Sequence, residues 1–505
     1  MTAFFNLGDL IGRDRDLEKV ALIDLGGEDG PRSFTYAAMD EMARGVARGL
    51  LARGLTRGDR VAILSANRAE YLATVFGVMR AGMVAVPVNF KFPRETIAFI
   101  IADADAKMVL CDPPRRAACP EGLPVVQFGG SDVEAFEPFL NPGDFESVIP
   151  RPREPAMFLY TSGSTGVPKG VILSHQSHLW VTETRLAGQD LSRHVYLIAA
   201  PMFHMNALSL SQLVFAAHAT MVLLPQFTAR DYIDAIASYR CTWLTAVPPM
   251  IAMMLREEDR LARADLSSVE FVRMGSAPVS ESLLGSLRRA LPKATINNAY
   301  GTTEAGPVVF GPHPRGLKQP DMSVGYPHPK VEIRLVDGAN RAADHGELEM
   351  KCPAVMNGYH NRPDRAAAIT PDGFYATGDI FRRDENGFHF FVGRVDDMFV
   401  SGGENIYPGD VEQMLERHPD VAQACIVPVD DDIKGQKPVA YIVPRAGATI
   451  SEDEIKQFAL AHAPAYQHPR SVWFLDHLPL ASTNKVDRAL LKTRAEVAIK
   501  ANRGN

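Results

Sequence analysis

Residues 160–170 read Tyr160-Thr-Ser-Gly-Ser-Thr-Gly-Val-Pro-Lys-Gly170 and follow the apolar run Met157-Phe-Leu. An apolar run that ends in glycines and hydroxyls predicts a buried strand opening into a loop that can approach phosphate groups closely. Hydroxyls and one lysine would add hydrogen bonds and charge. A flexible surface linker is the alternative, and the P-loop pattern does not fit because Pro168 replaces its second glycine. The candidate phosphate ligands are Thr161, Ser162, Gly163, Ser164, Thr165, Gly166 and Lys169.

Around this loop the sequence alternates between helical and extended patterns. Residues 39–50 have apolar side chains at helical spacing, and Val61–Leu64 is typical of a buried strand. A second helix over 71–79 precedes a strand over 83–88, and a strand over 271–274 is followed by a helix with Ser280 as its N-cap. Such alternation predicts a layered α/β fold.

The chain has 505 residues, which is too long for one ordinary domain. After about residue 393 the expected elements become shorter: a helix from Asp410, a strand over 424–427 and a capping box of Ser451 with Glu454. We therefore expect a large layered α/β domain over residues 1–393 and a small, mobile α+β domain over residues 394–505.

The composition excludes several classes of function. Lys and Arg total 53 against 60 Asp and Glu, giving a net charge of -7, which argues against nucleic acid as a partner. The five cysteines are scattered without C-x-x-C spacing, which argues against a disulfide framework and a zinc site. With no basic segment before an apolar run at the N-terminus, the pattern favours a cytoplasmic protein.

Residues 195–227 contain no Asp, Glu, Lys or Arg and are numerous enough to span a bilayer. Pro201, His204, Gln212 and Pro225 interrupt this stretch, and each would be costly in hydrocarbon. We expect a buried helix followed by a buried strand, and no integral membrane association.

The chain resembles the AMP-forming acyl-CoA synthetases and aryl-CoA ligases of the adenylate-forming superfamily. The resemblance covers nearly the whole chain, because every signature segment occurs in the family's order. These segments are the loop 160–170, Pro201-Met-Phe-His204, Asn298-Ala-Tyr-Gly-Thr-Thr-Glu304, Tyr375-Ala-Thr-Gly-Asp379, Gly393-Arg-Val-Asp-Asp397, Ser401-Gly-Gly-Glu-Asn405 and Leu480-Ala-Ser-Thr-Asn-Lys485.

The resemblance implies an ATP-dependent ligase for a small-molecule carboxylic acid, with ATP, Mg²⁺ and coenzyme A as its cofactors. The carboxylate attacks the α-phosphate of ATP to give acyl-AMP and pyrophosphate, and the CoA thiol then displaces AMP. Because two anions must meet, the site needs positive charge, which Lys485, Arg394 and Lys169 would supply together with Mg²⁺.

The family roles of the remaining nucleotide ligands carry over by position. Glu304 would hold Mg²⁺, as a hard cation requires, although a carboxylate at a helix start is the alternative. Thr303 would bond the α-phosphate, and Asn298 and Tyr300 would contact adenine. The other expected nucleotide-side residues are Gly275, Ser276, Ala277, Ala299, Gly301 and Thr302.

The later motifs imply ribose binding and domain rotation. Asp379, expected in a loop behind Gly378, would grip the ribose, although a turn-forming Asp is the alternative. Arg394 would bind ribose or phosphate, and Asp396 matches the hinge position. Lys485 is the expected catalytic lysine, with Asn484 where the family usually has glycine. After rotation, Ser401, Gly402 and Gly403 would line the pantetheine path, and His204 would lie where that path meets the acyl pocket.

The expected acyl pocket includes residues 204–211, Ala299 and residues 306–309. No acidic residue occurs in 201–230 to hold an ammonium group, which argues against an α-amino acid. Ala299 and Asn206 favour a compact or aromatic acid, benzoate-like or hydroxycinnamate-like, or a short or medium chain, over a long fatty chain. Delivery of the acyl group to a carrier protein, a non-catalytic nucleotide-binding homologue and an oxygenase of the luciferase type stay as alternatives.

Overall fold

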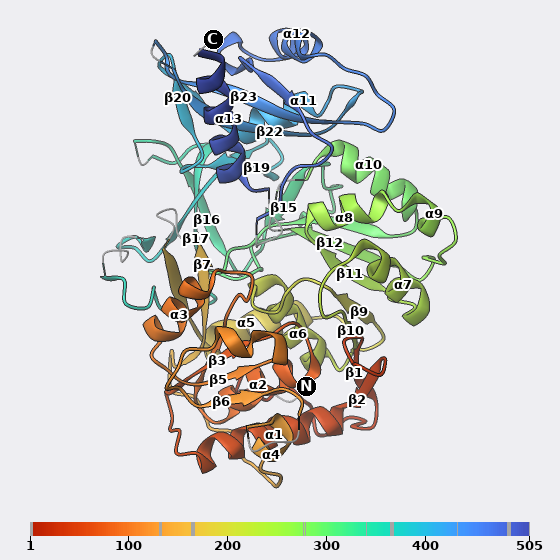
Figure 1. The fold of residues 1–505 in the computed structure, drawn as a ribbon, viewed down its shortest axis with the longest axis vertical. Coiled ribbons are helices and arrows are strands. Elements are labelled where there is room, and N and C mark those ends of the chain that lie inside the picture. The colour runs from red at the N-terminus through yellow and green to blue at the C-terminus, as the bar shows by residue number, and fades with distance from the viewer. Residues whose placement is uncertain are drawn as a thin grey trace.

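A seven-stranded sheet forms one half of the N-terminal part of the protein (Figure 1). The computed structural model describes residues 4–130, 134–162, 167–275, 277, 279–339, 341–363, 368–431, 433–481 and 486–503. The strands of this sheet are β1 (Val20–Asp24), β2 (Arg32–Thr35), β9 (Val195–Ile198), β10 (Thr220–Leu223), β11 (Trp243–Ala246), β12 (Phe271–Gly275) and β13 (Thr295–Ala299). They lie in the order β13-β12-β11-β9-β10-β1-β2, and only the β1–β2 pair is antiparallel.

A six-stranded sheet forms the other half. Its strands are β3 (Arg60–Leu64), β4 (Val84–Pro87), β5 (Ala106–Cys111), β6 (Val125–Gln127), β7 (Pro155–Ser162) and β8 (Pro168–Ser174). They lie in the order β6-β5-β3-β4-β7-β8. β7 and β8 pair antiparallel from Pro155 with Ser174 to Ser162 with Pro168, so residues 163–166 connect two paired strands.

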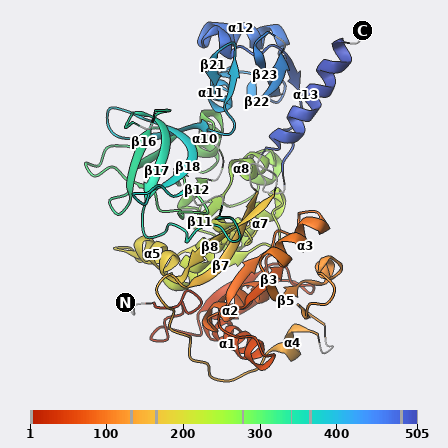
Figure 2. The same ribbon diagram turned by 90° about the vertical axis from the view of Figure 1, so that its left-hand side faces the viewer.

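Helices cover both faces of these two sheets. They are α1 (Tyr36–Ala52), α2 (Ala69–Arg80), α3 (Arg94–Asp103), α4 (Phe136–Phe139), α5 (His175–Leu186), α6 (Met205–Ala217), α7 (Ala229–Tyr239), α8 (Pro248–Leu255), α9 (Glu258–Leu261) and α10 (Glu281–Ala290). Figure 2 shows the two sheets and their helices from the side.

Successive side chains of a strand point to opposite faces of its sheet, so each sheet contributes to one inner and one outer hydrophobic cluster. Val61 and Ile63 of β3 join a cluster that contains α1, α2, α5 and α6, whereas Ala62 and Leu64 pack with α3. In the same way Tyr196 of β9 enters the shared inner cluster, and Leu197 packs with α7, α8 and α10 on the outside. The inner helices therefore share one core with the facing sides of both sheets.

A third, six-stranded antiparallel sheet follows the layered part. Its strands are β14 (Phe310–Gly311), β15 (Ser323–Pro327), β16 (Glu332–Val336), β17 (His345–Lys351), β18 (Tyr375–Arg383) and β19 (His389–Arg394), in the order β14-β15-β19-β18-β17-β16. β18 and β19 pair so that Asp379 lies opposite Arg394, which brings two of the expected ligands together.

The remaining sheet belongs to the C-terminal part, at the top of Figure 1. It contains β20 (Phe399–Ser401), β21 (Glu404–Ile406), β22 (Val421–Asp431), β23 (Gly435–Pro444) and β24 (Val472–Phe474), with α11 (Pro408–Leu415), α12 (Glu452–His462) and α13 (Arg488–Arg503). One face packs on α11 and α12 and the other on α13, so this part has cores of its own.

The predicted α/β fold class is confirmed, and most expected elements occur within a few residues of their predicted ends. Ser280 caps α10 by accepting from the Leu283 N–H, and Ser451 with Glu454 forms the expected capping box of α12. The interpretation of residues 195–227 was incomplete, because β9 precedes the predicted helix α6 and strand β10. The domain boundary near residue 394 stays a prediction.

Within the described part of the chain, no helix combines the length and the apolar character needed to cross a membrane.

Candidate active site

Lys169, Tyr359 and Glu304 form a hydrogen-bonded chain at the start of β8. The Tyr359 hydroxyl donates to Glu304 Oε1 at 2.8 Å and accepts from Lys169 Nζ at 2.9 Å. Lys169 Nζ also lies 3.8 Å from Glu304 Oε1. The tyrosine thus holds the predicted phosphate-binding cation beside the predicted metal-binding carboxylate.

Backbone pairing fixes both ends of this chain. The Ile172 N–H donates to Gly358 O at 3.0 Å, and the His360 N–H donates to Gly170 O at 2.8 Å, which holds Tyr359 against β8. Met356 N–H donates to Glu304 O at 2.7 Å. Glu304 lies in a turn closed by bonds between Thr302 and Gly306, so the alternative of a helix-start carboxylate is wrong.

Asp379 accepts two hydrogen bonds from side chains that the sequence singled out. The Tyr300 hydroxyl donates to Oδ2 at 2.5 Å, and Arg394 Nη1 donates to Oδ1 at 2.7 Å. Asp379 lies within β18, so its predicted place in a loop is wrong; its cross-strand position opposite Arg394 explains the ion pair. The buried carboxylate is held ready for hydroxyl or cation partners.

The electrostatics keep these groups in defined charge states. Burial, reinforced by the neighbouring Asp379 carboxylate, raises the pKa of Tyr300 well above its usual range, so its hydroxyl stays protonated. Burial opposes the charge of Arg394, but Asp379, Asp397 and Asp396 together raise its pKa. Burial and the nearby Glu304, Tyr359 and Tyr300 raise the pKa of Tyr375, which hydrogen-bonds Tyr359 and so lies between the two groups.

The expected adenine-side residues lie at the carboxyl ends of β12 and β13, where ligands bind open parallel sheets. Gly275 pairs with Ala299 across these strands, and Asn298 donates from Nδ2 to Met322 O at 3.1 Å. A Cβ at Gly301 would lie 2.7 Å from the Pro307 Cα, so this close turn admits only glycine. Met322, the residue before β15, therefore helps to position Asn298 together with strand β13.

His204 is the N-cap of α6, directly after the Pro201-Met-Phe segment. Its ring contacts Phe203 edge-on with the ring centroids 4.7 Å apart, and its backbone N–H donates to Pro201 O at 3.1 Å. Thr303 and His204 are both partly exposed.

Ser401, Gly402 and Gly403 form the hairpin between β20 and β21. Gly402 and Gly403 have φ angles of 62° and 89°, and Ser401 pairs with Glu404. A tight turn with two positive φ values by itself requires glycines. The turn alone therefore explains these two glycines, and a role in the pantetheine path would be a second reason for them.

Several predicted ligands lie outside the described residues: Gly163, Ser164, Thr165, Gly166, Ser276 and Lys485, as does the side chain of Ser162. Thr161 pairs with Lys169 across β7 and β8. Ala277 and Thr302 are partly exposed, and Asp396 Oδ2 lies 4.0 Å from Arg394 Nη2.

Leu480 and Val486, which flank the segment of Lys485, are placed by the structure. Leu480 and Val486 form an isolated antiparallel bridge, which brings the two ends of residues 481–485 together. Leu480 also lines a pocket of about 140 Å³ with Phe90, Lys91, Pro201 and Met250 among its other walls. The base of the lysine loop therefore faces the N-terminal part close to residue 204.

The donor set suits Mg²⁺. Glu304 offers one buried carboxylate, beside the lysine expected to hold phosphates. Mg²⁺ typically binds one or two carboxylates and takes its other ligands from water and substrate phosphates. The chemistry of this carboxylate therefore fits the ion.

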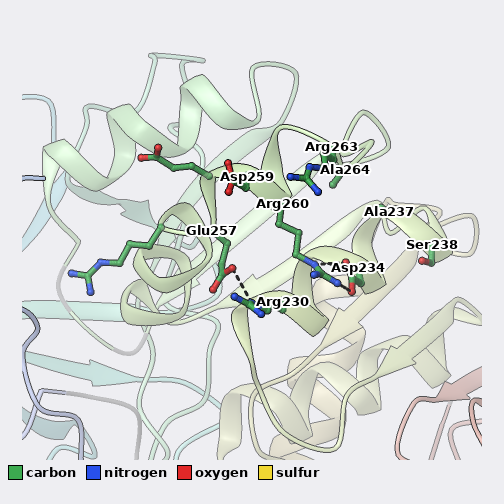
Figure 3. Close-up of a pocket in the computed structure, with 11 residues that line it drawn as sticks. Arg230, Asp234, Ala237, Ser238, Glu257, Asp259, Arg260, Arg263 and Ala264 are labelled. Carbon is green, nitrogen blue, oxygen red and sulfur yellow. Dashed lines mark hydrogen bonds and ion pairs between the residues drawn. The ribbon is translucent and has the colours of Figure 1, made fainter.

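A larger hollow lies elsewhere, between α7, α8 and α9, and has a volume of about 710 Å³ (Figure 3). Arg230 Nε lies 3.1 Å from Glu257 Oε2, and Arg260 Nε lies 2.7 Å from Asp234 Oδ1. These two arginines are already neutralised by carboxylates, so the hollow has the character of a solvated, charged surface.

Glu416 joins the C-terminal part to the N-terminal part. Its Oε1 accepts from the Ala424 N–H at 3.1 Å, and its carboxyl hydrogen-bonds Ser280, the N-cap of α10. Burial is the main cause that raises the pKa of Glu416 to about 8. Burial, reinforced by the neighbouring Glu412, thus favours the protonated acid, although the hydrogen bonds from Ala424 and Ser280 favour the carboxylate.

We expect the contribution of the buried Glu416 to the stability of the fold to fall as the pH rises. The folded-state pKa of Glu416 exceeds its usual value of 4.5, so the folded protein retains a proton that the unfolded chain loses between about pH 4.5 and pH 8. At pH 8, Glu416→Gln should raise the free energy of unfolding by roughly 2 kcal/mol and the melting temperature with it. At pH 4.5 it should leave both unchanged. Scanning calorimetry at both pH values, with the exposed Glu404→Gln as the control, tests this; an equal effect at both values contradicts it.

Sequence reasoning missed Tyr359 and Tyr375 as site residues. Tyr359 lies 55 positions from Glu304, its hydrogen-bond partner, and it is brought there by pairing with β8. The only local signal was Gly358, whose φ of 121° marks a turn before Tyr359. Arg273 carried a stronger signal, because a charged side chain interrupts the otherwise apolar predicted strand 271–274.

Comparison with known proteins gives consistent matches. A model of the AMP-binding enzyme family matches residues 13–360, and a model of its C-terminal domain matches residues 410–485. A feruloyl-CoA synthase from Amycolatopsis sp is 33% identical over 479 residues, covering 92% of this chain and 94% of the relative. An indoleacetate–CoA ligase from Aromatoleum aromaticum is 32% identical, covering 90% of this chain and 92% of the relative. The ATP-bound structure of MatB from Rhodopseudomonas palustris superposes with a TM-score of 0.88 at 27% identity, over 97% of this chain and 99% of that one.

Proposed function

The chain belongs to the AMP-binding enzyme family, as an AMP-forming acid–CoA ligase, and from this premise we propose that it activates a compact aromatic carboxylic acid with Mg²⁺-ATP. The single observation that carries this proposal is the pairing of two cations with two carboxylates in one region: Lys169 with Glu304, and Arg394 with Asp379. These charges match the phosphates, the metal and the ribose of one nucleotide.

The first step joins the acid to AMP. A carboxylate oxygen attacks the α-phosphorus, and the bond from that phosphorus to the pyrophosphate oxygen breaks. Lys169 and Arg394 offset the negative charge that gathers on the phosphates, and Asp379 accepts hydrogen bonds from the ribose hydroxyls after Tyr300 and Arg394 have oriented it. Thr303 would donate to the α-phosphate, and Lys485 would approach the same atoms from the C-terminal part.

Mg²⁺, when bound at Glu304, supplies charge neutralisation for the leaving pyrophosphate. The Tyr359 hydroxyl holds the Glu304 carboxylate and the Lys169 ammonium at fixed positions, so both groups enter the reaction already oriented.

The second step exchanges AMP for CoA. The CoA thiolate sulfur attacks the acyl carbonyl carbon, the carbon–oxygen bond to AMP breaks, and AMP leaves with its phosphate oxygen. A rotation about Asp396 would remove Lys485 and bring Ser401, Gly402 and Gly403 to the site, so that pantetheine passes beside glycine backbone and reaches the acyl group near His204. Separating the steps protects acyl-AMP from water.

An aromatic acid agrees with the relatives, whose names refer to ferulate and indoleacetate. All five cysteines are free thiols, which supports the cytoplasm as its compartment.

The test is an acid panel. Purified protein is incubated with Mg²⁺-ATP and benzoate, cinnamate, hydroxycinnamate, short-chain, medium-chain and palmitate acids, with and without CoA, and pyrophosphate, AMP and thioester are followed by mass spectrometry. We expect CoA-dependent thioester with aromatic acids, and EDTA should abolish pyrophosphate release.

The outcomes separate the alternatives. Preference for palmitate overturns the assigned substrate class. Pyrophosphate and bound acyl-AMP without thioester would indicate an enzyme that delivers its acyl group to a carrier protein. ATP binding with no pyrophosphate from any acid would indicate a non-catalytic homologue.

A further inference from the structure

Two arginines in the N-terminal part lack the acidic partners that arginines normally have when they are withdrawn from water. Arg185 lies in the last turn of α5, and Arg273 lies in the middle of β12. Both are only partly exposed, and neither forms an ion pair with any acidic side chain in the described ranges. Arg230 and Arg260, by contrast, each contact a carboxylate on the surface (Figure 3).

Arg273 faces the region expected to hold the acyl group. Its neighbours Val272 and Met274 pack in the outer core with α7, α8 and α10, so alternation places Arg273 on the inner face of the sheet. Its Nη2 donates to Pro307 O at 3.0 Å, within the expected pocket segment 306–309. It also pairs in register with Thr245, whose hydroxyl donates to Asn206 Oδ1 at 3.4 Å, within the other pocket segment.

Arg185 approaches the same region from α5. Val181 lies one turn earlier on this helix, and a Cβ added at Gly306 would lie 3.1 Å from its Cγ2, so α5 packs directly on the turn that begins segment 306–309. The charges of Arg185 and Arg273 are close enough to repel each other.

Unsatisfied hydrogen-bond donors accompany the two arginines. Tyr196 is fully buried, and its hydroxyl has no hydrogen-bond partner within the described part of the chain; the same holds for the buried Nε1 of Trp243. Tyr196 is the group whose charge interacts with Arg185. Buried donors in native proteins are normally satisfied, so these point to an acceptor that the chain itself does not supply.

The charge balance of this cluster is unfavourable without an anion. Burial, together with repulsion from Arg273, lowers the pKa of Arg185 to about 9, and burial lowers the pKa of Arg273 to about 10. Both guanidinium groups still carry their charge at neutral pH. Two neighbouring cations that are partly shielded from water are stabilised most strongly by a carboxylate, which accepts bidentate hydrogen bonds from guanidinium.

We propose that Arg185 and Arg273 bind a second carboxylate of the substrate, so that the preferred acid is a compact aromatic dicarboxylate activated at the carboxyl group remote from these arginines. This inference rests on the proposed function, since it concerns the acid that the ligase adenylates. The stacked rings of Tyr196, Trp243 and Phe271 pack two residues before Arg273 and its partner Thr245, toward the amino ends of the same strands. The two cations give the chain a means of rejecting the matching monoacid, because a desolvated charge left without its partner is costly.

Matched pairs of acids test the proposal. Terephthalate is compared with benzoate, 4-carboxyphenylacetate with phenylacetate, and 4-carboxycinnamate with cinnamate, by the ratio of their kcat/KM values for CoA thioester formation. We expect the wild-type protein to prefer the diacid in at least one pair by about 100-fold or more. Arg185→Met and Arg273→Met should each lower that ratio by about 100-fold, and Arg193→Met, which alters an exposed arginine paired with Glu270, should leave it unchanged.

The ratio, rather than either rate alone, is the readout, so partial misfolding of one variant does not imitate the effect. Arg185→Lys provides a second variant that keeps the charge and loses the bidentate geometry, and it should give an intermediate ratio. Thioester from monoacids with no preference for any diacid overturns this inference and leaves the proposed function standing. A diacid preference that survives both methionine substitutions also overturns it, and the absence of thioester from every acid overturns the proposed function itself.

Discussion

Glu304→Gln is expected to slow pyrophosphate release from ATP by roughly 100- to 1,000-fold, the loss typical of removing one group that stabilises transition-state charge. Glutamine has nearly the same shape but lacks the negative charge that a hard cation requires. The apparent affinity for Mg²⁺ should fall with the rate, so that raising the Mg²⁺ concentration restores part of the activity.

In the absence of metal, Glu304→Gln should have a different effect: it should not weaken ATP binding. Lys169 Nζ lies 3.8 Å from Glu304 Oε1 and is linked to it through Tyr359. ATP must compete with this carboxylate for the lysine. Without the carboxylate charge, Lys169 interacts more freely with phosphate, so ATP binding measured by calorimetry in EDTA should be unchanged or tighter. A loss of rate accompanied by an equal loss of metal-free ATP binding would contradict the assignment of Glu304 to the metal.

Two controls separate charge from packing. Tyr359→Phe removes only the bridging hydroxyl, and because Lys169 and Glu304 both persist, we expect at most about a 10-fold loss. Glu332→Gln alters an exposed carboxylate on β16 and should have no effect on rate or on Mg²⁺ dependence. A Tyr359→Phe loss as large as that of Glu304→Gln would mean that the hydroxyl, and not the carboxylate charge, carries the function.

How far the sequence predicts the site depends on whether its contacts are local. Glu304, Asp379 and Arg394 lie in compact motifs, and their residue types alone suggest metal or ribose chemistry. The Tyr359 bridge depends on pairing between residues 357–360 and β8, which joins segments almost 190 positions apart. No periodicity in either segment indicates such a pairing, because it is set by the packing of the third sheet on the second.

The fold was predictable for a different reason. Strands such as β3 and β9 have apolar side chains on both faces, as strands covered by helices on both sides must, and this pattern is visible without any partner. Short elements without a period were missed: β9 has four residues and merges with the apolar run of α6. The position of Asp379 was misjudged because Gly378 and Asp379 resemble a turn, whereas Gly378 is held by the Glu347 carboxylate inside β18.

Lys485→Ala is expected to reduce the first half-reaction by about 1,000-fold, the upper end of the loss caused by deleting one charge-stabilising group. The lysine would lie on the phosphate oxygens only while carboxylate and ATP react. The loop that carries it has its base at the Leu480–Val486 bridge, and Leu480 lines a pocket together with Pro201, three residues before His204.

Measuring the two half-reactions separately tests the role of Lys485. Thioester formation from synthetic acyl-AMP and CoA needs the rotated C-terminal part, from which Lys485 is withdrawn, so Lys485→Ala should retain that rate within about 10-fold and should still bind ATP. Lys492→Ala changes a lysine on α13 and serves as the matched control for both steps. Equal loss in the two half-reactions would show that the lysine acts through the stability of the C-terminal part, and unimpaired adenylation would remove it from the active site. A selective loss would instead establish that one small domain serves the two chemical steps with two different faces, with Asp396 as the point at which they exchange.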